Sequence, residues 1–205
     1  MANTHPKRKR ARKNRQEEIY MAYKNKYDKG GNCSVMGHRA EGTFSNLAEV
    51  RGFNIQEATR QENMHEHWDF ALDRWGDKDD DLVYMLVDVK ARKKTRRKDT
   101  KFNDEWVWLE FKNVQGHNGW LKGNATHIAF EREHDFVLAP RKNLWEWANK
   151  EIKRRNGVGS NATAANARDA RYKYYTRWQR KDVLSQVHMQ DMMEGVKDTK
   201  VWKKT

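Results

Sequence analysis

The chain has 205 residues, and because both ends are polar and charged we expect one domain with appended arms rather than two domains. Its 42 Lys and Arg residues outnumber its 29 Asp and Glu residues, and this clustered positive charge indicates a polyanionic partner, with nucleic acid as the first expectation. A single cysteine, Cys33, excludes an internal disulfide bond and a four-thiolate zinc site, and the sequence shows no apolar run suited to a signal peptide or a membrane span.

Residues 1–42 are predicted to be a basic N-terminal arm outside the core. Seven of the nine residues from 7 to 15 are basic, and we expect this run to contact nucleic acid without sequence specificity. A short helix is then predicted to begin at Ser45, whose hydroxyl can cap the first turn, and to end at Gly52 in the left-handed conformation. Glu49 lies on the last turn of this helix.

Three strands are predicted next, over residues 67–72, 82–91 and 105–112, because each combines aromatic or β-branched residues with partial alternation. A meander is the arrangement we expect for these strands. The later elements are predicted in chain order as a hairpin of 128–131 and 135–139, a helix over 143–155, a flexible segment over 157–166 and paired strands over 172–177 and 183–189. The fold class is therefore α/β, a mixed β-sheet flanked by α-helices over residues 43–190, with a charged tail at 191–205.

The second predicted strand carries an acid and a lysine on one side. The period of a strand places Asp88 and Lys90 on the same face. Phosphodiester cleavage requires a divalent cation, which acidifies a water, and a cationic group that orients that water. Mg²⁺ takes only one or two carboxylates, so Asp69 from the preceding strand and the carbonyl of Val89 would complete its protein ligands. Glu49 would reach the same pocket if its helix packs across the sheet.

The context of this Asp-x-Lys triplet favours the catalytic interpretation over a solvated face. The triplet alone is a weak signal, because 35% of the residues are charged. It lies on a hydrophobic strand, it follows another acid on a hydrophobic strand, and a basic loop comes directly after it. We expect the cations of this loop to hold phosphates on either side of the scissile bond. They are Arg92, Lys93, Lys94, Arg96, Arg97 and Lys98.

In their order along the chain, Glu49, Asp69, Asp88 and Lys90 resemble the motif of the PD-(D/E)xK nuclease superfamily. The runs at 87–91, 108–114 and 119–121 are similar to small phage-encoded proteins of this type, some of them grouped with Holliday-junction resolvases. The resemblance implies a restriction-endonuclease-like fold and a Mg²⁺-dependent DNA endonuclease, with Mn²⁺ able to replace Mg²⁺. The single cysteine and the lack of a long apolar run favour a cytoplasmic location, which for a phage protein is the host cytoplasm, and no membrane partner. As a hypothesis, the resemblance also implies a homodimer.

Alternatives remain open for the register of the motif and for the function. Glu110 and Lys112 form a Glu-x-Lys on the third strand, so a second register takes these two as the core pair and Asp88 as the first acid. We prefer the first register because it explains Asp69, and Glu110 then assists from the adjacent strand. The alternative functions are a catalytically inactive DNA- or RNA-binding protein and a packaging protein that uses charge alone. His67 is interpreted as a surface histidine, because it has no thiolate partners for zinc.

Overall fold

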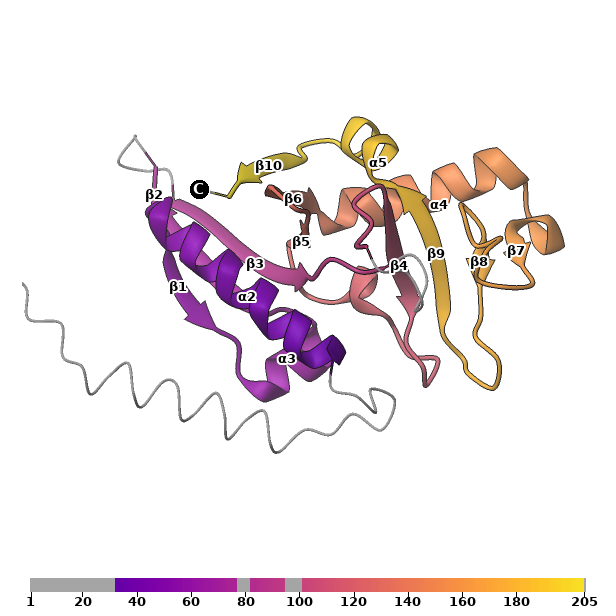
Figure 1. Ribbon diagram of the computed structural model, residues 1–205, viewed down its shortest axis with the longest axis horizontal. Coiled ribbons are helices and arrows are strands. Elements are labelled where there is room, and N and C mark those ends of the chain that lie inside the picture. Colours follow the sequence, from indigo (N-terminus) through magenta and orange to yellow (C-terminus); the bar gives the residue numbers. More distant parts are fainter. Residues whose placement is uncertain (1–31, 77–81, 95–100, 205) are drawn as a thin grey trace, which may run out of the picture. The chain divides into compact units, whose positions relative to one another are not determined.

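The computed structural model describes residues 32–76, 82–94 and 101–204 (Figure 1). The described residues from 37 onward belong to one compact unit, and the fold and the site below are those of this unit. The basic run at residues 7–15 lies outside the described residues. Within the three described ranges, no helix is both long enough and apolar enough to cross a membrane.

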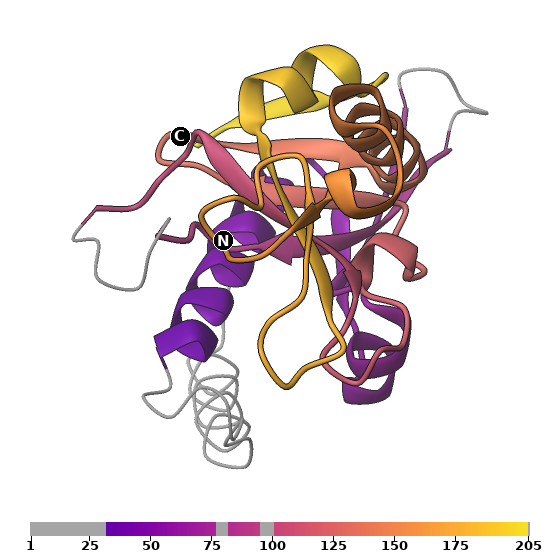
Figure 2. The same ribbon diagram turned by 90° about the vertical axis from the view of Figure 1, so that its right-hand side faces the viewer.

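Two β-sheets organise the unit. The six-stranded sheet has the order β1 (Asn54–Glu57), β2 (Phe70–Trp75), β3 (Leu82–Lys90), β5 (His127–Glu131), β6 (Asp135–Pro140) and β10 (Lys200–Lys203). All of its neighbours are antiparallel except β3 and β5. Strands β5 and β6 are buried along almost their whole length, which is typical of strands covered on both faces. The four-stranded sheet has the order β4 (Trp106–Lys112), β9 (Val183–His188), β8 (Tyr174–Tyr175) and β7 (Thr163–Ala164). Figure 2 turns this second sheet toward the viewer.

Helices cover both faces of the six-stranded sheet. On one face, the core cluster contains the buried side of α2 (Asn32–Val50), with Phe44 packed edge-on against Phe136 of β6. On the other face, α4 (Arg141–Asn156) buries Leu144 in a second cluster, which also takes in the four-stranded sheet. The shorter helices are α3 (Arg60–Glu66), α5 (Met189–Gly195), η1 (Trp120–Lys122) and η2 (Gly159–Ala162). The predicted mixed α/β class is confirmed.

Several predicted elements are confirmed in place. Helix α2 ends as expected, because Gly52 has a φ of 77° and the N–H of Phe53 donates to the carbonyl oxygen of Ala48 at 3.1 Å. The hairpin of β5 and β6, the helix α4 and the antiparallel contact of β8 with β9 also form as expected.

Three predictions are wrong. The three predicted strands do not form a meander, because β4 belongs to the second sheet, where it pairs with β9, and β3 pairs in parallel with β5. The helix predicted to begin at Ser45 already begins at Asn32, so Ser45 lies in its interior and residues 37–42 belong to the compact unit. The predicted tail, 191–205, instead contains the end of α5 and strand β10, whose Trp202 stacks on Phe44 with the ring centroids 5.6 Å apart.

Candidate active site

Asp69 is held at the point where β2 begins and β3 runs past it. The β2–β3 pairing ends at Phe70 opposite Val87, and beyond it Oδ2 of Asp69 accepts a hydrogen bond from the N–H of Val89 at 2.6 Å. Oδ1 of Asp69 accepts a hydrogen bond from the side-chain amide of Asn63, on α3. The N–H of Asp69 also donates to the carbonyl oxygen of Val87 at 2.8 Å. The carboxylate is therefore fixed beside β3 by its own strand register.

Asp88 and Lys90 lie on the face of β3 that is turned away from α2, as the alternation predicted. Lys90 Nζ donates to Asp88 Oδ1 at 2.5 Å, and Asp88 is only 3% exposed. The other oxygen of Asp88, Oδ2, is buried and has no hydrogen-bond partner, the one such side-chain atom among the described residues. A buried carboxylate oxygen without a partner carries a free-energy cost that a bound cation or water would remove.

Carboxyl groups outnumber ammonium groups around Lys90. Burial raises the pKa of Asp69 well above its usual value, and the negative charge of Asp88 raises it further. Burial alone would lower the pKa of Lys90, but Asp88, Asp69 and Glu110 together raise it above the usual lysine value. Lys90 therefore keeps its proton at neutral pH, and three carboxyl groups surround one ammonium group.

Glu110 approaches Lys90 from β4 of the second sheet. Burial raises the pKa of Glu110, while the positive charges of Lys90 and Lys93 oppose this shift. Gly119 packs directly against Glu110, because a Cβ there would meet the Glu110 carbonyl oxygen and lie 2.8 Å from its Cγ. The chain then turns into η1, where the Trp120 ring centroid lies 5.1 Å from Lys90 Nζ.

The second register of the motif is not supported by this arrangement. Lys112 is exposed, and the β4–β9 pairing shifts register between Glu110 and Lys112. The charge that acts on Glu110 most strongly is that of Lys90. The structure therefore brings together Asp69, Asp88, Lys90 and Glu110.

Glu49 does not belong to the site, and another acid of the same helix, Glu41, acts on the charge of Asp69. Glu49 is exposed at the end of α2. Glu41 lies two turns earlier on the same helix, and its negative charge contributes to the raised pKa of Asp69. The signal was present in the sequence, because Ala40, Phe44 and Ala48 repeat at helical spacing and form the buried side of a helix that starts well before Ser45.

His67 is also part of this region, contrary to its interpretation as a surface histidine. It follows α3 with a φ of 58°, in the left-handed region that few residues other than glycine adopt. Burial lowers the pKa of His67, an effect that the negative charge of Asp88 and the backbone of Asn118 oppose. Gly123 packs so closely that a Cβ there would lie 2.7 Å from the Cβ of His67.

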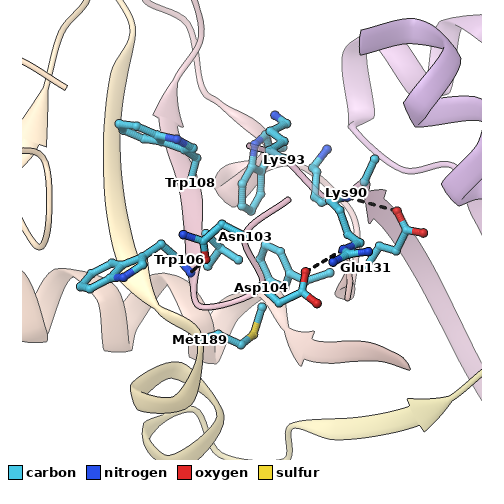
Figure 3. Close-up of a pocket in the computed structure, with 13 residues that line it drawn as sticks. Lys90, Lys93, Asn103, Asp104, Trp106, Trp108, Glu131 and Met189 are labelled. Atoms are coloured by element: carbon cyan, nitrogen blue, oxygen red, sulfur yellow. Dashed lines mark hydrogen bonds and ion pairs between the residues drawn. The ribbon is translucent and has the colours of Figure 1, made fainter. Parts of the chain in front are cut away.

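The predicted phosphate-binding loop is only partly described. Arg92 was predicted to contact phosphate, but its side chain is only 16% exposed and its guanidinium pairs with Asp104 at 2.7 Å. Lys93 and Lys94 are exposed, whereas Arg96, Arg97 and Lys98 lie outside the described residues. Figure 3 shows the adjoining pocket, with Lys90 and Lys93 on one side and the tryptophans of β4 on the other.

The residues present fit a magnesium ion. In the described ranges, no group of three or more His, Cys, Asp and Glu residues is arranged to hold a metal. Mg²⁺ needs only one or two carboxylates and takes its other ligands from water, phosphate or backbone carbonyls. Asp88 offers its unpartnered Oδ2, and Asp69 retains lone pairs beyond its two hydrogen bonds. No protein-family model, curated protein or solved structure matches the chain.

Proposed function

We propose that this chain is a Mg²⁺-dependent DNA endonuclease that hydrolyses phosphodiester bonds, with a restriction-endonuclease-like fold and a PD-(D/E)xK active site. The observation that carries the proposal is the buried, unpartnered Oδ2 of Asp88 beside Asp69 and Lys90. A structural ion pair satisfies its own oxygens, whereas this arrangement keeps one carboxylate oxygen for a further partner. The surplus of carboxyl groups indicates that this partner is a cation.

Each residue of the site has a defined role in the proposal. Asp69 and Asp88 hold Mg²⁺, with the carbonyl of Val89 as an additional ligand. When bound, Mg²⁺ supplies charge neutralisation at the phosphate and an acidified water. Lys90 keeps its proton because of the surrounding acids, so it acts as a hydrogen-bond donor that orients the attacking water and the scissile phosphate. Glu110 orients Lys90 from the opposite sheet.

DNA is the proposed polyanion. The net charge of +13 supports long-range attraction to phosphates, and Lys93 and Lys94 are exposed within three and four residues of Lys90. These lysines contact the backbone on either side of the cut and carry no sequence information. A cytoplasmic location, the exchange of Mg²⁺ for Mn²⁺ and a homodimer are further parts of the proposal, and the last two follow from the resemblance.

The test is cleavage of labelled linear, nicked, flapped and four-way DNA with Mg²⁺ or with chelator. Asp88→Asn and Lys90→Met are expected to lose cleavage by at least about 100-fold while binding persists, because each removes a group that acts on the reacting phosphate. Glu49→Gln is the matched control, since it neutralises an exposed acid of α2 outside the site. Glu41→Gln is expected to reduce cleavage and Glu49→Gln is not.

The same experiment separates the proposal from its rivals. A catalytically inactive DNA- or RNA-binding protein would bind equally well in all variants and cut nothing. A packaging protein would bind DNA with an affinity that falls steeply with salt and that does not change with Mg²⁺ or chelator, and it would cut nothing. Either result would refute the nuclease.

A further inference from the structure

One face of the four-stranded sheet carries a row of aromatic side chains that begins next to the candidate site. Trp106, Trp108 and Glu110 lie two residues apart on β4, so their side chains share a face. Cross-strand pairs extend this face, because Glu110 lies opposite Leu184 of β9 and Leu184 lies opposite Tyr175 of β8. The face therefore runs from an acid of the candidate site across three strands.

We call Trp106, Trp108, Tyr175 and Arg171 the aromatic face. The three rings are half-buried, so each keeps part of its surface open to solvent. The rings of Trp108 and Tyr175 are tilted by 45°, with their centroids 6.3 Å apart. The guanidinium of Arg171 lies 4.0 Å from the ring centroid of Trp106, which shows that this ring accepts a planar group on its face.

The aromatic face and the candidate catalytic lysine open onto one pocket. Lys90, Lys93, Trp106, Trp108 and Trp120 all line it. Figure 3 shows Trp106 and Trp108 leaving β4 on the same side of the strand. A nucleic acid strand that lies on the aromatic face would therefore have its backbone within reach of these two lysines.

We propose that the aromatic face binds unpaired bases of a DNA strand by stacking and leads that strand to Asp88 and Lys90. Bases in a duplex are stacked on each other, whereas an unpaired base exposes its π-face to an aromatic side chain. The positive charge of Arg171 and Lys93 complements the phosphates of the same strand. Gln186, the amide opposite Trp108, is only 3% exposed and is therefore not available to base edges. Because every base has a π-face, we expect stacking on this face to tolerate any sequence.

This inference rests on the proposed nuclease function for the cleavage step and specifies its substrate. The preferred DNA contains an unpaired stretch next to the cut, as in a flap, an overhang or an open branch. A perfectly paired duplex offers no base to the aromatic face and is the poorer substrate.

The test uses a single-stranded oligonucleotide labelled with 2-aminopurine and the full chain carrying Asp88→Asn, with Mg²⁺ present, so that binding is measured without cleavage. Stacking on the aromatic face is expected to quench the fluorescence. Trp108→Ala is expected to weaken binding by about 5- to 150-fold, the range of base–aromatic stacking, whereas Trp108→Phe retains most of the affinity. Trp75→Ala is the matched control, because Trp75 is 68% exposed and pairs with Leu82, at the opposite end of β3 from Lys90.

The outcomes for the aromatic face and for the nuclease are distinguishable. Unchanged single-strand affinity in both Trp108→Ala and Tyr175→Ala would overturn the aromatic face, even if the native protein cuts DNA. Quenching that depends on Trp108 supports it, even if the native protein cuts nothing. If Trp108→Ala fails to fold, Tyr175→Ala and Trp108→Phe replace it. Weaker binding by Tyr175→Ala together with retained affinity in Trp108→Phe supports the aromatic face, and unchanged affinity in Tyr175→Ala overturns it. Native protein that cuts paired duplex as fast as flapped DNA would overturn the substrate assignment.

Discussion

Replacing Lys90 by methionine isolates the charge balance of the candidate site. The ammonium group lies 2.5 Å from a carboxylate that is 3% exposed. At that distance an effective dielectric constant of about 20 gives an attraction of roughly 7 kcal/mol. Much of this offsets the desolvation of the two groups, and breaking one partner of a buried pair costs about 3–5 kcal/mol. Because the Lys90 side chain is 25% exposed, we expect a loss near the lower end, about 3 kcal/mol.

The assay is thermal and urea unfolding in chelator, with a double-variant cycle. For a chain of this length, a loss of about 3 kcal/mol lowers the melting temperature by about 6–12 °C. Adding Asp88→Asn to Lys90→Met is expected to restore most of the stability, because the uncompensated carboxylate is then absent. Mg²⁺ should stabilise Lys90→Met and have little effect on the double variant. A Lys90→Met variant that melts within about 2 °C of the native protein, less than about 1 kcal/mol for this chain length, or a double variant as unstable as the single one, would refute this charge balance.

Three further predictions concern stability and its dependence on pH. Glu131 is buried and accepts two hydrogen bonds from Arg39. Glu131→Gln should therefore lower the free energy of unfolding in urea by about 3 kcal/mol, and an unchanged urea midpoint would contradict this. Burial, and then the hydrogen bond to the carboxylate of Asp191, raises the pKa of Tyr172 to about 12. The protonated Tyr172 side chain therefore contributes its full stabilisation below about pH 10, and this stabilisation is lost as the pH rises towards 12. Tyr172→Phe should show less alkaline destabilisation than the native protein, and equal loss in both would refute this. Gly119→Ala should lower both the cleavage rate and the melting temperature, because the new Cβ would clash with Glu110. In Gly42→Ala the new Cβ meets nothing within 4 Å, so this variant should be more stable than the native protein by up to about 1 kcal/mol.

Local patterns predicted the strand that carries the candidate chemistry. Strand β3 ends at Lys90, one residue before its predicted end, and its alternation places Asp88 and Lys90 together because a two-residue period is a property of the strand itself. Glu110 was predicted to assist from an adjacent strand. It does lie beside Lys90, but it comes from a different sheet.

The sequence did not predict the contacts between distant segments, because no local pattern of residues encodes them. The parallel contact of β3 with β5 joins residues that are forty positions apart in the sequence, and it depends on which faces remain to be buried. The start of α2 was missed because Gly37 and Gly42 interrupt its pattern, and a helix that contains two glycines needs tertiary packing to form. Glu41 and His67 join the site only through these long-range contacts.

The hydrogen bond from the Val89 amide to Asp69 makes that amide a spectroscopic reporter of the site. Its proton chemical shift and its exchange rate depend on the charge of a single carboxylate at 2.6 Å. Titrating magnesium into ¹⁵N-labelled protein should therefore move the Val89 resonance before any substrate is added, and the amide of Ala129, which lies opposite Val89 on the next strand, provides the internal reference. Metal occupancy can in this way be read from the backbone, independently of turnover.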